Sequence, residues 1–180
     1  MKTILWREKP VHVWLNEVPN WTYEVLNVDR RHLSTTKRHA ETVQQLAIEM
    51  IVPGPRASYG ALGVVFVPDD SQQLCVEVSV SNAQGDIVAD SLAAGIDTVR
   101  KGFPEEYVAG FLDGIMPYEP LQTLGGGTLS FCCALHGEIG SSIRFFQVIG
   151  RVIINLLTYQ LSSLSDEDLV EIIQKSLRTS

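Results

Sequence analysis

The sequence lacks the motifs that identify the common classes of nucleotide-dependent and hydrolytic enzymes. Residues 54–60 contain no Lys-Ser/Thr pair after a second glycine, so this segment is not a phosphate-binding P-loop. The three glycines at 125–127 precede an expected strand, which excludes a dinucleotide-binding turn, and we interpret them as a flexible connector. Neither a Gly-x-Ser-x-Gly elbow nor a His-Glu-x-x-His helix occurs. No reaction can be assigned from these motifs.

Cysteine is scarce, and none of it is spaced for a metal or redox motif. The chain has three cysteines, Cys75, Cys132 and Cys133, with no Cys-x-x-Cys pair. Adjacent residues of a strand point to opposite faces, so Cys132 and Cys133 are expected to lie apart as small buried side chains. We therefore predict no metal and no cofactor. The odd count, together with an N-terminus in which charge returns at Arg7, indicates a cytoplasmic protein.

The sequence also has no uninterrupted apolar run long enough for a membrane span. Residues 143–161 are rich in Phe, Val, Ile and Leu, but polar residues recur along them at three- and four-residue steps. These are Arg144, Gln147, Arg151, Asn155 and Thr158. Their spacing places them on one side of a helix, so we predict a helix with a wide buried face and one polar stripe.

Positive charge is in short supply. The formal net charge is −7 over 180 residues, and 45% of the residues are hydrophobic. Residues 1–50 hold seven Lys/Arg and six Asp/Glu, so the remaining 130 residues carry the acidic excess. An acidic domain is a poor binder of bare nucleic acid, because phosphate contacts require clustered cations. The length and apolar content fit one folded domain.

What is present is an alternation of strand-like and helix-like segments. The first half predicts strands at 11–15 and 22–28, then a helix from a cap at residues 34–36 to about Met50, then a β-hairpin of 62–67 and 74–81. The second half predicts helices at 86–101 and 104–115, a strand at 128–135, a long helix capped by Ser141 or Ser142, and a last helix from Ser165.

Two groups of polar residues are candidates for function. His136, at an expected strand end, is followed by Glu138, and this pair would support either acid–base chemistry or a simple polar contact. A basic run contains Arg30, Arg31, Lys37 and Arg38, and it is either a solvated helix entry or an anion-binding patch.

Three short motifs follow one another in the second part of the chain. Residues 104–108 read Pro-Glu-Glu-Tyr-Val and are followed by a Gly-Ile pair at 114–115, residues 58–66 read Ser-Tyr-Gly-Ala-Leu-Gly-Val-Val-Phe, and an expected strand ending at His136 is followed by paired serines at 141–142. These motifs resemble a helix start, a strand entry, and the last strand, tip loop and long helix of domain IV of elongation factor G and of the related tetracycline ribosomal protection proteins. The resemblance covers about residues 54–161.

The resemblance implies an α+β two-layer sandwich of the ribosomal protein S5 domain 2-like type, a four-stranded mixed sheet with two helices on one face. Residues 1–53 would be an N-terminal β/α elaboration and 162–180 a C-terminal helix of the same single domain. The loops 54–59 and 136–142 would form the tip, which in the elongation factor reaches the ribosomal decoding site. The implied tip or partner-binding residues are Arg56, Ser58, Tyr59, His136, Glu138, Ser141 and Ser142.

The departures from the family limit what the resemblance implies about function. No GTPase domain is present, so GTP-driven translocation is excluded, and Pro53 and Pro55 replace a Gly-rich first tip loop. We expect a non-catalytic binding domain that engages a macromolecular partner, either a protein or the ribosome and structured RNA. Two alternatives stay open: a small enzyme of the same superfamily with a site near His136, Glu138 and Arg56, and an immunity-type or other protein-interaction module. The wide apolar face of the long helix also leaves a homodimer open.

Overall fold

A computed structural model describes residues 1–6, 8–35, 42–52, 54, 55 and 57–178. Its strands are β1 (Lys2–Trp6), β2 (Lys9–Leu15), β3 (Asn27–Ser34), β4 (Gln44–Val52), β5 (Ser58–Pro68), β6 (Gln73–Val80), β7 (Val99–Lys101) and β8 (Gly127–Gly137). Its helices are α1 (Glu105–Ile115), α2 (Glu119–Gln122), α3 (Ile143–Leu157) and α4 (Asp166–Arg178), with a 3₁₀ turn at Leu161–Ser163.

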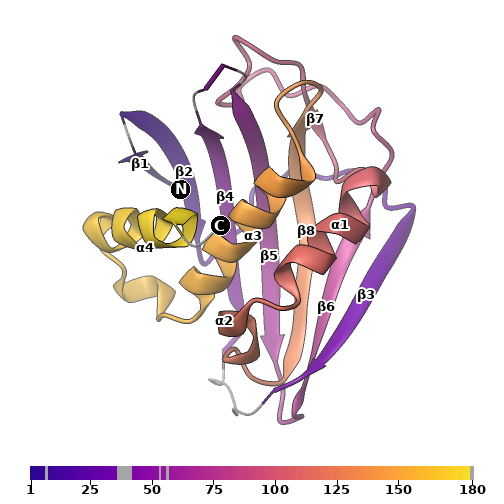
Figure 1. Cartoon of the computed structure of the whole chain (residues 1–180), viewed down its shortest axis with the longest axis vertical. Coiled ribbons are helices and arrows are strands. Elements are labelled where there is room, and N and C mark those ends of the chain that lie inside the picture. Colours follow the sequence, from indigo (N-terminus) through magenta and orange to yellow (C-terminus); the bar gives the residue numbers. More distant parts are fainter. Residues whose placement is uncertain (7, 36–41, 53, 56, 179–180) are drawn as a thin grey trace.

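All the strands join one mixed sheet, and the helices cover one of its faces (Figure 1). The strand order is β1-β2-β4-β5-β8-β6-β3, with β7 added to the end of β8. Every pair is antiparallel except β6 and β8. This arrangement confirms the predicted α+β two-layer class, although the sheet is larger than the four strands that the resemblance implied.

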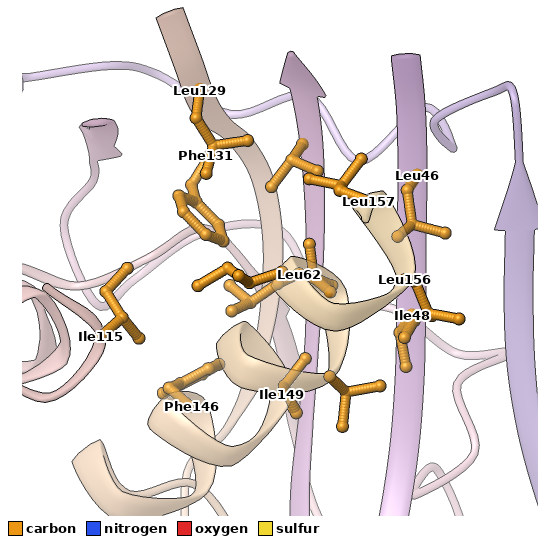
Figure 2. Packing of buried hydrophobic residues seen from close by; sticks show 14 of the residues in the cluster. Leu46, Ile48, Leu62, Ile115, Leu129, Phe131, Phe146, Ile149, Leu156 and Leu157 are labelled. Atoms are coloured by element: carbon orange, nitrogen blue, oxygen red, sulfur yellow. The ribbon is translucent and has the colours of Figure 1, made fainter. Parts of the chain in front are cut away.

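The main core lies between the sheet and the helical layer, where α3 crosses β4 and β5 (Figure 2). Side chains from both layers meet there and are fully or almost fully buried, among them Leu46, Ile48, Leu62, Phe131, Phe146, Ile149, Leu156 and Leu157. Burial of this apolar surface is the main force that holds the two layers together.

Elements with strong local signals form where the sequence predicts them. In α1, Pro104 precedes the first turn and Glu105 and Glu106 lie in it, near the positive end of the helix dipole. Ser142 caps α3, because its Oγ accepts a hydrogen bond from Phe145 N at 3.2 Å. In the box that starts α4, Asp168 N donates to Ser165 Oγ while Ser165 N donates to Asp168 Oδ2.

The predicted helix from residues 34–36 to Met50 is wrong, because residues 44–52 form strand β4. Leu46, Ile48 and Met50 face the helical layer, while Ala47 and Glu49 face the other side. Residues 46–50 are all buried, so the period-two alternation that identifies a strand is hidden. Residues 36–41 of the predicted helix lie outside the described residues.

The predicted hairpin of 62–67 and 74–81 is also wrong, although both segments are strands. β8 lies between β5 and β6, antiparallel to the first and parallel to the second. The tight turn at residues 69–72 therefore joins two strands that are not neighbours. A local turn pattern cannot reveal that a strand beginning only at Gly127 inserts between these two.

Two further predicted elements are replaced by irregular segments on the face of the sheet opposite the helices, which we call the back face. Residues 86–98 form turns rather than a helix, and only residues 99–101 are regular, as β7. Residues 16–26, which we call the strap, cross the back face from β2 to β3, so the predicted strand 22–28 is wrong except at its end. Tyr23 of the strap donates a hydrogen bond to Ser79 O on β6 at 3.0 Å.

The wide apolar face of α3 is explained within the chain. α3 packs on the sheet, against α1 on one side and against α4 on the other. Leu169 and Ile173 of α4 are fully buried there. Among the described residues, no helix combines the length and hydropathy needed to cross a bilayer.

Candidate functional site

The two loops expected to form the tip meet at one end of the sheet, at the top of Figure 1. Tyr59 N, at the start of β5, donates to Gly140 O in the loop after β8 at 3.0 Å. Ser141 Oγ donates to Tyr59 O and accepts from Gly137 N, both at 2.8 Å. These hydrogen bonds hold the backbone of the β8–α3 loop against β5. The tip therefore has one defined backbone arrangement.

A residue that the sequence did not single out completes this end of the molecule. The carboxylate of Asp97 accepts hydrogen bonds from Gly140 N at 2.7 Å and from Ile139 N at 3.2 Å. It therefore clamps residues 86–98 to the β8–α3 loop. The sequence pattern predicted that Asp97 lies inside a helix. The only indication of its actual role is the general tendency of aspartate to accept backbone hydrogen bonds in loops.

The clamped tip exposes apolar side chains beside a hollow. Ile96 and Ile139 are 62% and 72% exposed, and both flank the Asp97 contact. A cavity of about 310 Å³ opens next to Ile96. Its lining is mostly apolar and consists of Lys9, Pro10, Ile51, Ala57, Leu92, Gly95 and Ile96. Apolar side chains held on a fixed backbone are suited to contact another apolar surface.

Among the implied tip residues, Ser58 and Tyr59 lie in β5 and Arg56 lies outside the described residues. The Tyr59 side chain points into the protein and is 1% exposed. Its hydroxyl donates to Glu49 Oε1 at 2.8 Å. Burial, and next the nearby Glu49 carboxylate, raise the pKa of Tyr59 above its ordinary range.

Glu49 is the centre of a buried polar cluster that was not predicted from the sequence. Its Oε1 accepts from Tyr59 OH and from Leu92 N, and its Oε2 lies 2.9 Å from His12 Nδ1. The carboxylate thus joins strands β2, β4 and β5 to the segment before Asp97. Three partners use most of its acceptor capacity, which is how a buried carboxylate is accommodated.

His136 is not displayed at the tip, because β8 continues through it to Gly137. The imidazole is 3% exposed, with Nδ1 3.0 Å from Gly102 O and Nε2 3.3 Å from Ala83 O. Both ring nitrogens thus face backbone carbonyls, which leaves neither directed at a substrate. Glu138 lies apart from the ring and pairs with Arg100 Nε at 2.7 Å.

The predicted anion patch is not assembled in the part of the chain that can be described. Arg30 and Arg31 are adjacent in β3, so their side chains leave opposite faces of the strand. Arg30 Nε pairs with Glu77 Oε1 at 2.7 Å, which neutralises one of the two charges locally. Lys37 and Arg38 lie outside the described residues.

Within the described ranges, no group of three or more His, Cys, Asp and Glu side chains is arranged to hold a metal ion. Comparisons of the chain with protein-family models, with curated proteins and with solved structures find no match.

Proposed function

We propose that this chain is a non-catalytic binding domain whose tip docks on a protein partner. The observation that carries the proposal is the pair of exposed isoleucines, Ile96 and Ile139, held on a backbone that the Asp97 carboxylate clamps. Exposed apolar side chains on a rigid support lose little conformational entropy on binding, so most of the burial energy is available for affinity.

The polar side chains near the tip are hydrogen-bonded to other groups of the chain, which favours a binding function over a catalytic one. A general base or nucleophile must reach a reacting atom, and Glu49, His136 and Asp97 are each directed at donors or acceptors of the chain itself. Their contacts stabilise the sheet and the tip loops. What the tip offers to a partner is shape, apolar surface and the Lys9 side chain at the rim of the hollow.

Charge favours a protein over RNA as that partner. A net charge of −7 repels phosphates at long range, while a protein surface requires no cationic patch. The resemblance to elongation factor G domain IV points instead to the ribosome. The succession of β5, β6, α1, β8 and α3 along the chain supports this alternative, while β7 and α2, which lie among these elements, and the insertion of β8 between β5 and β6 depart from the family pattern. We give the charge more weight in choosing the class of partner.

Site-specific photocrosslinking in the native host tests the proposal. A benzoylphenylalanine placed at Ile139 should give a discrete protein adduct, because this side chain would face the partner. The same group at Leu5, which is 67% exposed on β1, is the matched control and should give no such adduct. Digestion with nuclease and with protease identifies the crosslinked class, and adducts with ribosomal RNA alone would contradict the proposal.

A substitution separates docking from folding. Ile96→Asp places a charge beside the hollow and should abolish the adduct formed at position 139 while leaving the melting temperature unchanged. Val67→Asp is the control, since Val67 is 46% exposed near the other end of β5. Equal loss of the adduct in both variants would show that the tip is not the docking surface.

A further inference from the structure

Cys132 and Cys133 lie on the same face of the sheet, contrary to the expectation from strand geometry. Between β5 and β8 the register shifts, so that Gly63 pairs with Cys133 but Val64 pairs with Phe131. Cys132 is therefore the extra residue of a β-bulge. Phe131 and Ala134 both belong to the core under the helices, which places the two intervening cysteine side chains together on the back face.

The two sulfurs are close enough to influence each other's ionisation. The neighbouring Cys133 thiol is the main cause that lowers the pKa of Cys132, because a thiol beside the sulfur stabilises the thiolate. While it is protonated, Cys132 Sγ donates to Gly63 O, 3.9 Å away. The neighbouring Cys132 sulfur, and next burial, raise the pKa of Cys133. One sulfur is thus prepared as a nucleophile, and its neighbour stays a protonated thiol.

The surroundings leave Cys132 the more accessible of the two sulfurs. Cys132 is half-buried, whereas Cys133 is 6% exposed. Two residues of the strap lie close by. A Cβ on Gly63 would lie 2.3 Å from Cys133 Sγ and 3.5 Å from Val18 Cγ1, and negative charge on either sulfur would raise the pKa of the Tyr23 phenol. On β6 the nearest charged group is Glu77, which accepts a hydrogen bond from Ser130 on β8 and pairs with Arg30 on β3.

We propose that Cys132 and Cys133 are a peroxide-oxidisable dithiol, in which Cys132 is oxidised first and Cys133 resolves it. The Cys132 thiolate attacks the terminal oxygen of a hydroperoxide, the O–O bond breaks, and a sulfenic acid forms with release of hydroxide or alkoxide. The Cys133 sulfur then attacks the Cys132 sulfur, an S–S bond forms, and the hydroxyl leaves with the Cys133 proton as water. In sum, two thiols lose two electrons and the peroxide is reduced.

The bulge supplies the freedom that this ring closure needs. Adjacent Cα atoms are about 3.8 Å apart, which is closer than in most disulfides, so the intervening peptide must rotate. Cys132 is left out of the ladder between β8 and β5, where Gly63 and Val64 pair with its neighbours. The peptide between the two cysteines can therefore turn with fewer strand hydrogen bonds to break.

Cys75 serves as an internal control, because its side chain is exposed to a similar degree as that of Cys132 but has no cysteine next to it in the sequence. It is half-buried on the same face but pairs with Thr128, four residues along β8 from Cys132, or about 13 Å away. Burial, and next the Glu77 carboxylate, raise its pKa. Cys132 should react with hydrogen peroxide about tenfold faster than Cys75 at pH 7, since its larger thiolate fraction outweighs its lower intrinsic nucleophilicity.

Hydrogen peroxide treatment of the full chain, followed by alkylation and intact-mass and peptide analysis, tests the proposal. The wild type and Cys75→Ser should lose two hydrogens, become protected at positions 132 and 133, and be restored by dithiothreitol. Cys133→Ser should instead stop at a sulfenic acid on Cys132, trapped by dimedone, and Cys132→Ser should stay reduced at Cys133. A wild type in which Cys75 reacts first, or in which only intermolecular disulfides form, would overturn the proposal.

Phenylarsine oxide probes the juxtaposition in the unmodified wild type, so the test does not depend on the folding of the variants. Its arsenic forms two As–S bonds with a neighbouring dithiol and releases water. We expect 1:1 binding that protects Cys132 and Cys133 from alkylation and leaves Cys75 reactive. Failure to protect both residues would show that the two sulfurs do not share a face.

Discussion

At the scale of single residues, the most consequential group is the Glu49 carboxylate. It is buried at 3% exposure and accepts from Tyr59 OH and Leu92 N, with His12 Nδ1 as its third partner. Glu49→Ala would leave these buried groups unpaired, and we expect it to lower the free energy of unfolding by about 3 kcal/mol. Urea denaturation followed by circular dichroism measures this. Glu24→Ala, on the exposed surface of the strap, should change the value by less than about 0.5 kcal/mol, and equal effects would contradict the role of Glu49.

The raised pKa values of Tyr23 and Tyr59 predict how the free energy of unfolding changes at alkaline pH. The pKa of Tyr59 is raised by burial and Glu49, and that of Tyr23 by burial and the two thiols, both from an ordinary value of 10.0. Above pH 10 the unfolded chain loses these protons while the folded chain keeps them. The stabilisation is therefore complete below pH 10 and declines as the pH rises, by about 1.4 kcal/mol per pH unit for each group.

Urea unfolding at several pH values between 9 and 11 checks this decline. Tyr59→Phe removes one of the two contributions, so the slope of stability against pH above 10 should become shallower by about 1.4 kcal/mol per unit. A variant with the same slope as the wild type would show that Tyr59 ionises normally in the folded protein.

At the scale of elements, close approach of α1 and α3 depends on glycine. A Cβ at Gly150 would lie 2.7 Å from Phe111 Cε2 and 3.1 Å from Ile115 Cγ2, atoms that are held in the core. The polar stripe of α3 lies at the same contact, where Gln147 donates to Gly110 O at 2.7 Å and Arg151 donates to Gly114 O at 3.2 Å. The stripe predicted from sequence is thus largely a helix–helix contact.

Gly150→Ala should therefore destabilise the protein, although alanine is the better helix former. We expect a loss of about 2 kcal/mol, because overpacking forces α1 and α3 apart. Gly95→Ala is the matched control, since a Cβ there meets nothing within 4 Å, and it should be neutral or slightly stabilising. Thermal unfolding of both variants measures the difference, and a more stable Gly150→Ala would contradict the close packing.

At the scale of the whole molecule, α4 completes the helical layer. It packs against α3 and β1, and Asn155 of α3 donates a hydrogen bond to Ser176 Oγ at 2.6 Å. A chain that ends at Leu164 would expose the apolar side of α3 that Leu169 and Ile173 cover. We expect such a chain to self-associate or to melt at a much lower temperature. Light scattering and circular dichroism test this, and a monomer with unchanged melting would show that α4 is dispensable.

The elements that could be predicted are those whose cause is local. Ser142, Pro104 and the Ser165–Asp168 box act on backbone groups a few residues away, so their helices follow from the sequence. The tip was located only through resemblance, and the Asp97 clamp was not predicted at all. Its acceptor and donors are more than 40 residues apart in the chain.

The sequence by itself determined the helices α1, α3 and α4 and the acidic charge, because hydrophobic period, caps and composition are properties of short segments. The two-layer α+β class was predicted through the resemblance to domain IV of elongation factor G. Only the tertiary structure decided that residues 44–52 are a strand, that β8 separates β5 and β6, and that a bulge turns Cys132 and Cys133 to one face. These outcomes depend on which strands pair and in what register. That choice is made by packing across the whole sheet, which no local pattern contains.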